Sequence, residues 1–475
     1  MSRPLALFAF ALAACPSLPA HAHTSERAFV LTLPTGLYVA GGTLVVVLSF
    51  LLVALTPMAR TRSLAGLGRP LGRVPRAVGD GAGVVSLALT VALVAAGVVG
   101  TQDPLANPLP LTVWTLWWIG FTAAHAVFGD LWSAANPWRG AHALLRLVPG
   151  LRAIVERPPL RYPPWLGAWP AVAGFAGFAW FELVSVAPQA PEILARAVAL
   201  YFSVNLAGTL AFGLSPWLRE AEAFSMFFRM VAWLSPLNGR PDATGADRVV
   251  VATLPGLGLL RVAPPRTSGA IFVLLALGTV SFDGLAQTFW WLDLIGVNPL
   301  EFPGRSAVTV PNTLGLLAMV AVLAAAFGAA VRLGQRMSRD TAPYVARLGA
   351  TVVSIVPIAL GYHMAHYLTS FLVDAQYAAI AANDPLNLGW DLVGLGDAHV
   401  TTSFLNELAS VRLIWHAQVG IVVIAHVVAV GVGHLLAVRH AANRGDAMLG
   451  QAPLTTLMIA YTLFGLWLLA TPVAG

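Results

Sequence analysis

The run LGLLAMVAVLAAAFGAAV, residues 314–331, carries no charged side chain and is long enough to cross a lipid bilayer as a helix. A membrane-spanning helix needs roughly 20 predominantly apolar residues, and similar runs recur along the chain. Because these runs are continuous rather than alternating, they predict helices and exclude a β-barrel. We predict ten spans, at residues 36–56, 83–101, 111–128, 164–186, 194–214, 269–291, 311–332, 346–372, 411–438 and 450–471. The fold class is therefore an all-α polytopic transmembrane bundle.

The composition agrees with this class. Of the 475 residues, 58% are hydrophobic and 10% are charged, whereas a soluble domain carries about 25% charged residues. The net charge of +6 does not indicate a nucleic-acid partner, because the basic residues lie mostly in short loops where membrane orientation explains them. The expected partner is the lipid bilayer, and the sequence identifies no protein partner.

The arginines orient the bundle. All 27 basic residues are Arg, and nearly all lie in loops that follow odd-numbered spans. Apart from Arg3 near the start, the other side holds Arg27, Arg196, Arg305 and Arg412. The Arg-rich side should be cytoplasmic, which puts both termini in the periplasm of a bacterial inner membrane. Residues 23–475 should form one domain, with a cytoplasmic insertion at 215–267 and a periplasmic loop at 373–410.

Two short segments of the insertion have expected conformations. Residues 222–234 (EAFSMFFRMVAWL) are aromatic and carry one Arg, which predicts a helix lying in the membrane interface. Residues 248–262 have the pattern of a small β-hairpin that turns at Pro255-Gly256.

Residues 1–22 resemble a secretory signal peptide. Arg3 precedes a short apolar region, and Ala20-His21-Ala22 matches the small-x-small cleavage pattern. Cleavage there would make His23 the first residue, offering an amine and a ring nitrogen to a metal. Two alternatives stay open: Leu12-Ala-Ala-Cys15 also resembles a lipobox, which would leave a lipidated Cys15, and the leader could be retained as an anchor.

Ionisable side chains within the spans gather in one layer near the periplasmic side. Such residues are costly in a bilayer and are functional candidates. The layer contains His363 and His366 in the eighth span, Asp283 in the sixth, His416 in the ninth and Glu182 in the fourth. His-x-x-His places two imidazoles on neighbouring positions of one helix. We therefore predict a polar site opening to the periplasm.

A divalent metal, zinc or copper, is one candidate occupant of this site. The ligands would be His363, His366, Asp283 and His416, with His23 as a further ligand and with Glu182, Asp374 and His399 as neighbours that orient them. The alternative is that the histidines only hydrogen-bond between helices. His426 and His434 in the ninth span suggest another possibility, a proton path with His416 or a b-type haem held by histidines of two helices.

Several stretches resemble a family of bacterial multi-span proteins known as fenitrothion hydrolases. They are AHAHTSER (20–27), LPT (33–35), GDLW (129–132), NPWR (136–139), SFDG (281–284), GYHMAH (361–366) and WHAQV (415–419). The resemblance covers most of the chain and implies a membrane protein linked to hydrolysis of organophosphorus triesters. It assigns no catalytic residues.

Three functions are compatible with these observations. The first is a metal-dependent hydrolase, in which metal-bound hydroxide attacks the phosphorus ester of a hydrophobic small-molecule substrate. The second is an ion or metal transporter, in which the same side chains bind an ion transiently. The third is a haem-bearing redox protein that uses His426.

Overall fold

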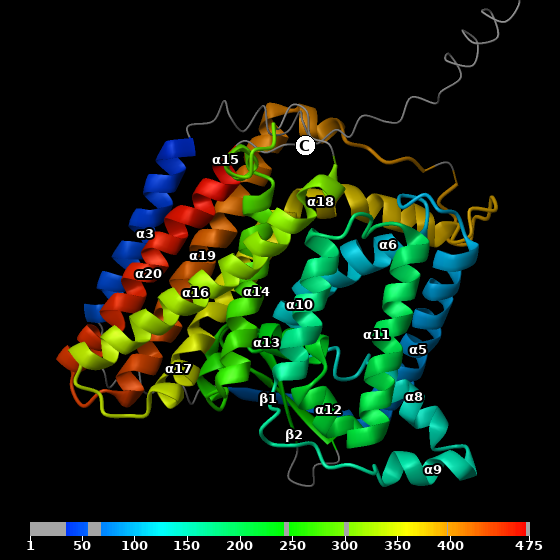
Figure 1. The fold of residues 1–475 in the computed structure, drawn as a ribbon, viewed down its shortest axis with the longest axis horizontal. Helices are drawn as coiled ribbons and strands as arrows, with labels where there is room; N and C mark the ends of the chain where they lie inside the picture. Colours follow the sequence, from blue (N-terminus) through cyan, green and yellow to red (C-terminus); the bar gives the residue numbers. More distant parts are fainter. Residues whose placement is uncertain (1–34, 56–67, 242–246, 299–303, 397, 472–475) are drawn as a thin grey trace, which may run out of the picture.

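The computed structural model describes residues 35–55, 68–241, 247–298, 304–396 and 398–471, and over these ranges the chain is a helical bundle (Figure 1). Nine helices in the described ranges are long and apolar enough to cross a membrane. Seven are single helices: α3 (Thr35–Leu55), α5 (Arg76–Val99), α11 (Pro191–Phe212), α14 (Thr267–Ala286), α16 (Thr309–Met337), α19 (Leu408–His440) and α20 (Arg444–Ala470). Two are composite: α6–η1–α7 (Pro108–Pro110, Leu111–Phe121, Thr122–Phe128) and α17–η5–α18 (Tyr344–Val352, Val353–Ile355, Val356–Asn383).

The tenth predicted span is a shorter helix. Residues 164–186 contain α10 (Trp169–Leu183), whose 15 residues fall short of a full crossing. Pro170 lies in its first turn, where a proline is tolerated because that N–H has no helical partner. Figure 1 shows α10 between α11 and α14, so this segment is a helix of the bundle even though it is short. The predicted all-α bundle is confirmed.

Helix α14 lies at the centre of the bundle. Almost every residue from Ser268 to Leu285 is buried, because α14 packs against α10, α16 and α18. By contrast, α3 and α5 expose many leucine and valine side chains, as expected for helices that face lipid. A polar side chain on α14 is therefore surrounded by protein rather than by lipid.

The segment 222–234 was predicted to lie in the membrane interface. In the structure it is buried within the protein instead. It forms α13 (Ala223–Ala232), and Phe224, Phe227 and Phe228 all pack into the main hydrophobic core. Seven of the ten residues of α13, all of them apolar, are buried. This part of the insertion therefore packs inside the bundle instead of lying along its surface.

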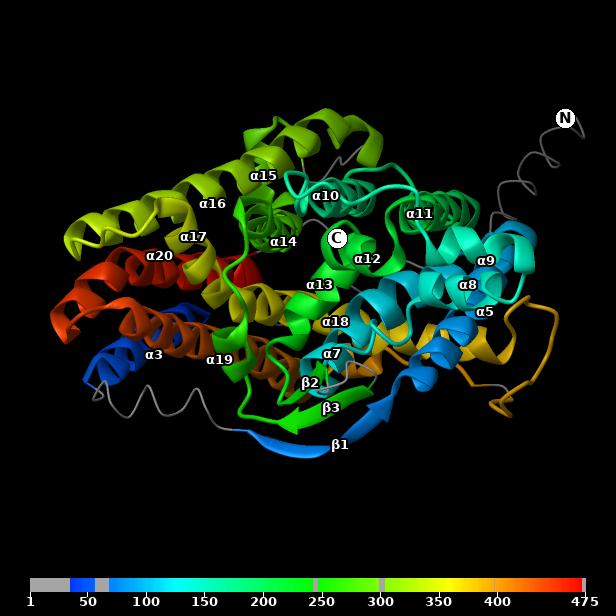
Figure 2. The ribbon, with the colours of Figure 1, turned by 90° about the horizontal axis from the view of Figure 1, so that it is seen from below.

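The predicted hairpin with a turn at Pro255-Gly256 does not form, and a different pair of strands lies earlier in the chain. Strands β2 (Leu237–Pro241) and β3 (Asp247–Ala252) pair antiparallel, and β1 (Arg69–Pro75) adds a third strand in the order β1-β3-β2 (Figure 2). Pro255-Gly256 instead precedes a 3-10 turn, η2 (Leu257–Arg261), in which Leu257, Leu259 and Leu260 are buried. Burying these leucines in the core removes residues 257–261 from the sheet.

Two spans have irregular backbone. Residues 111–121 form a π-helix, a conformation often found at functional sites. The eighth span is broken by the 3-10 turn η5 just before Pro357, where a proline was expected to disturb the helix. Beyond this break, Gly361 lets α18 approach α19 closely, because a Cβ there would lie 2.3 Å from the Ala425 Cβ.

The predicted periplasmic loop 373–410 is partly helical. Helix α18 continues to Asn383 and α19 begins at Leu408, with the short turn η6 (Ser403–Asn406) before it. In the remaining loop, Asp384 accepts hydrogen bonds from the backbone N–H groups of Leu388 and Gly389. Asp391 accepts one from the Asn383 side chain. These carboxylates shape the loop.

The two ends of the bundle differ in charge. One end, called here the Arg-rich end, carries the sheet, α8 (Pro137–Leu145), α9 (Pro149–Glu156), α12 (Leu214–Glu220) and the turn between α16 and α17 (Figure 1). The start of α3 and the end of α20 lie together at the opposite end, with α15 (Phe289–Leu294) and η4 (Arg305–Val308). The predicted signal peptide, Cys15 and His23 lie outside the described residues.

Candidate functional site

A carboxylate and an imidazole meet between α14 and α18. Asp283 Oδ2 lies 2.8 Å from His366 Nε2, and the two side chains are only 10% and 11% exposed. Asp283 is three residues before the end of α14, so the pair lies toward the end of the bundle opposite the Arg-rich end. The predicted proximity of Asp283 to the His-x-x-His motif is therefore found, through its second histidine.

Tyr367 links this pair to a second carboxyl group. Its hydroxyl oxygen lies 2.6 Å from Asp283 Oδ2 and 3.0 Å from Glu182 Oε1. A tyrosine hydroxyl has one hydrogen and can donate it to only one of the two oxygens. Both contacts are satisfied when Tyr367 donates to Asp283 and a protonated Glu182 donates to the Tyr367 oxygen. The geometry of the cluster thus accommodates one shared proton.

Two further side chains complete the cluster. Gln287, one turn after Asp283, donates a hydrogen bond of 3.1 Å to Asp283 Oδ1. Arg305 donates to the backbone carbonyls of Glu182 and Ser185, and its positive charge interacts with both carboxyl groups. With a neutral His366, the two carboxylates and one guanidinium leave one negative charge. One added proton makes the cluster electrically neutral, which is the favoured state away from water.

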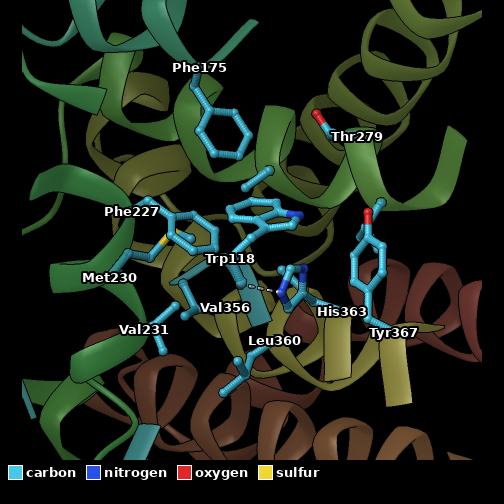
Figure 3. A pocket seen from close by; sticks show the side chains of 13 residues that line it. Trp118, Phe175, Phe227, Met230, Val231, Thr279, Val356, Leu360, His363 and Tyr367 are labelled. Atoms are coloured by element: carbon cyan, nitrogen blue, oxygen red, sulfur yellow. Dashed lines mark hydrogen bonds between the residues drawn. The ribbon is translucent and has the colours of Figure 1, made fainter. Parts of the chain in front are cut away.

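His363 faces a different part of the bundle. Its Nε2 lies 3.0 Å from the backbone oxygen of Trp118, in the π-helix η1 (Figure 3). That oxygen also accepts from the Thr122 hydroxyl at 2.6 Å. Buried backbone carbonyls need partners, and this one has side-chain partners on its own span and on α18. His363 therefore has a structural partner of its own and does not reach Asp283 in this arrangement.

A small apolar cavity separates the two regions. It is lined by Trp118, Phe175, Phe227 and Met230, with His363 and Tyr367 pointing toward it from α18 (Figure 3). Its volume of about 20 Å³ is enough for one water molecule. This space is too small for an organic substrate.

The other predicted site residues are not part of the cluster. His416 Nε2 lies 2.8 Å from the Tyr38 hydroxyl, which joins α19 to α3. His399 is exposed in the loop before α19. Asp374 lies on α18 seven residues beyond Tyr367, about 10 Å further along the helix. Of the three predicted orienting neighbours, Glu182 is the one connected to Asp283.

His426 and His434 are buried along α19. His426 Nδ1 lies 2.8 Å from its own helix at the Val422 carbonyl, and its ring lies beside Tyr461. His434 Nδ1 is 3.0 Å from Gln451 Nε2, beside a cavity of about 280 Å³ toward the Arg-rich end. Neither Nε2 atom has a hydrogen-bond partner within the described ranges. The two residues are eight positions apart on one helix, about 12 Å, so a proton cannot pass directly from one imidazole to the other.

The fit of a metal can be judged from its donors. Among the described residues, no three His, Cys, Asp or Glu side chains are arranged to hold a metal ion. His366 and Asp283 provide two adjacent donors, whereas catalytic zinc usually has three protein ligands. These two donors alone do not fit such a metal. A zinc or copper site that also uses His23, which lies outside the described residues, stays a prediction. Haem ligation by His363 would require loss of its bond to Trp118, and it also stays a prediction.

Sequence reasoning missed three members of the cluster, namely Tyr367, Gln287 and Arg305. Tyr367 directly follows His366, and Gln287 follows Asp283 by one helical turn, so local spacing pointed to both. Arg305 gave one signal, because it is among the few arginines on its side of the chain.

The chain was compared with known protein families, with curated proteins and with solved structures. None of the three comparisons finds a match, so its function must be inferred from the site itself.

Proposed function

We propose that this protein is a proton-coupled membrane transporter and that Glu182, Tyr367, Asp283 and His366 form its proton-binding site. The observation that carries the proposal is the single Tyr367 hydroxyl between two carboxyl oxygens, at 2.6 and 3.0 Å. That arrangement is satisfied when one carboxyl group holds a proton. Carboxylates and histidines inside membranes commonly serve as proton relays in pumps and transporters.

The cluster supports proton transfer without large movements. Glu182 gives its proton to the Tyr367 oxygen while Tyr367 gives its own proton to Asp283, which exchanges the charges of the two carboxyl groups. His366 Nε2, at 2.8 Å from Asp283 Oδ2, accepts the proton in turn when the neutral ring carries its hydrogen on Nδ1, and the ring then stores it as an imidazolium. Each step breaks one O–H bond and forms one O–H or N–H bond, so no other reactant is needed.

The charge of the cluster couples proton release to the movement of a second ion or of the helices. The cluster is neutral with one added proton and carries one negative charge without it. An uncompensated charge is costly in the interior of a bundle. Release of the proton therefore favours entry of a cation or a rearrangement that admits water. Helix α18, which carries His366 and Tyr367, belongs to a span interrupted at η5 about 16 Å before the cluster, and interrupted spans are common in transporters.

The positive-inside rule gives the orientation of this proposal. With the Arg-rich end in the cytoplasm of a bacterial inner membrane, both termini and the proton site belong to the periplasmic half. Asp283 and Glu182 lie near the ends of α14 and α10 that are farthest from the Arg-rich loops. The site would then exchange protons with the periplasm.

Infrared spectroscopy and proton flux test this function. We expect a protonated-carboxyl band in purified protein at neutral pH, and we expect Glu182→Gln or Asp283→Asn to abolish it. In proteoliposomes, the same variants should lose proton uptake reported by an internal pH dye. Glu192→Gln is the matched control, because Glu192 is exposed and paired with Arg196 on the same helix. Retention of the band and of uptake in both cluster variants would contradict the proposal.

A second candidate is the metal-dependent hydrolase of organophosphorus esters that the sequence resemblance suggests. The Asp283–His366 hydrogen bond favours it, because a carboxylate that orients an imidazole recurs in metal sites and in general-base catalysis. Element analysis of purified protein and a triester hydrolysis assay with and without a chelator test it. Stoichiometric metal together with chelator-sensitive hydrolysis would favour this candidate over proton transport.

A further inference from the structure

A groove opens at the Arg-rich end where three spans begin or end. It lies between the loop 158–167, the end of α11, helix α12 and the start of α14, and its volume is about 550 Å³. Its lining contains three arginines, one glutamate and one tyrosine, namely Arg161, Arg219, Arg266, Glu220 and Tyr162. The groove is thus large and positively charged.

One of the three arginines is paired with a carboxylate, and the other two are not neutralised. Arg266 donates a 2.6 Å hydrogen bond to the Pro164 carbonyl, which leaves its charge uncompensated. Arg219 pairs with Glu220 at 3.2 Å. Arg161 forms no salt bridge with another residue in the described parts of the chain. The lining therefore keeps two more guanidinium groups than carboxylates.

Tyr162 fixes one wall of the groove. Its hydroxyl donates a 2.6 Å hydrogen bond to the Gly167 carbonyl, and its ring meets Trp217 edge to face. Burial, and then the negative charge of Glu220, raise the pKa of Tyr162 to about 12. The phenol therefore stays protonated at neutral pH and adds no negative charge to the groove.

The rim of the groove has the character of a membrane interface. Leu160 lines the groove and is 52% exposed, and Trp165, which lies in the chain between the lining residues Pro164 and Gly167, is 78% exposed. Exposed tryptophan beside the ends of spans marks the depth of lipid headgroups. A basic groove between helix ends at this depth is suited to an anionic headgroup.

We infer that this groove binds the phosphate of an anionic phospholipid, with the guanidinium groups of Arg161, Arg219 and Arg266 holding the phosphate and the apolar rim contacting the acyl chains. A soluble phosphate compound shares the charge chemistry but would leave Trp165 and Leu160 exposed to the bilayer without using them. The inference does not depend on the proposed transport function.

Native mass spectrometry of the delipidated full-length protein tests this site. The probes are phosphatidylglycerol, phosphatidylcholine and inorganic phosphate. We expect phosphatidylglycerol to bind in preference to phosphatidylcholine. Replacing the three arginines by Gln should weaken phosphatidylglycerol binding roughly a hundredfold, at about fivefold per arginine. The matched control replaces Arg152, Arg157 and Arg336, which are exposed at the same end but lie outside the groove.

Three results would overturn the inference. The groove variant could retain as much phosphatidylglycerol as the control variant, phosphatidylcholine could bind equally well, or inorganic phosphate could displace the lipid completely. The last result would assign the groove to a soluble phosphate compound instead. The single variant Arg161→Gln protects the test against misfolding, because the groove then keeps two arginines and the expected loss is still about fivefold.

Discussion

His366 Nε2 on α18 lies 2.8 Å from Asp283 Oδ2 on α14, so an imidazole and a carboxylate from two spans form a hydrogen-bonded pair inside the bundle. Both side chains are about nine-tenths buried. His363, one turn earlier on α18, bonds to a backbone carbonyl instead. The two histidines of one motif therefore have different roles, and substitution can separate them.

We expect His366→Ala to lower the free energy of unfolding by about 2–4 kcal/mol more than His363→Ala does. Removing His366 takes one of three hydrogen-bond partners from a buried carboxylate and leaves only Tyr367 and Gln287, which is costly, whereas His363 contributes an interhelical hydrogen bond of about 0.6 kcal/mol. Denaturant unfolding in detergent measures both variants. Because each change removes the same side chain, packing losses largely cancel. Equal destabilisation would show that Asp283 does not depend on His366.

The shared proton predicts that Glu182 and Tyr367 are energetically coupled. A double-mutant cycle with Glu182→Gln and Tyr367→Phe should give a coupling free energy of about 0.5–3 kcal/mol, as for residues in one hydrogen-bond network. Tyr38→Phe serves as the control partner, because Tyr38 contacts His416 instead. Its combination with Glu182→Gln should be additive. An additive result for Glu182 and Tyr367 would contradict the shared hydrogen-bond network.

The loop after α18 should loosen in acid. Hydrogen bonds from the Asn383 side chain and the Gly396 backbone hold the pKa of Asp391 below its ordinary value of 3.8. Because the folded pKa is the lower one, the carboxylate stabilises the loop above pH 3.8 and the contribution is lost as the pH falls through the lowered pKa. Hydrogen exchange of residues 384–396, corrected for intrinsic rates, should therefore accelerate there. Asp391→Asn should weaken this pH dependence.

Close packing of α18 on α19 predicts opposite effects at two glycines. Gly361→Ala should destabilise the protein by about 1–3 kcal/mol, because its Cβ would lie 2.3 Å from the Ala425 Cβ. Gly420→Ala on α19 meets no heavy atom within 4 Å and should stabilise the helix by up to about 1 kcal/mol. Thermal unfolding of both variants in detergent decides the matter. A neutral Gly361→Ala would mean that the two helices are farther apart.

Chemical labelling tests the orientation. The single native cysteine, Cys15, is first replaced by Ser. A membrane-impermeant maleimide applied to spheroplasts should then label Leu388→Cys. Leu388 is 63% exposed in the loop between α18 and α19. Ala153→Cys, exposed on α9 at the Arg-rich end, should react only after lysis. Labelling of both positions in intact spheroplasts would contradict the positive-inside assignment.

The sequence determined the fold class and three members of the polar cluster. Long uncharged runs can satisfy their backbone hydrogen bonds in lipid only as helices, so hydropathy alone located the spans. The cost of ionisable groups in a bilayer singled out Glu182, Asp283 and His366, which the structure joins through Tyr367. These properties depend on local composition and spacing, which the sequence contains in full.

Only the tertiary structure decided which side chains meet. Residues three apart on a helix point about 60° away from each other, so the rotation of α18 sets which histidine faces Asp283. That rotation depends on the close approach at Gly361 and on the Trp118 carbonyl that the π-helix offers to His363. The burial of α13 and the pairing of β1 with β3 are likewise long-range. Packing between distant segments fixes these relationships, and no local pattern in the sequence encodes them.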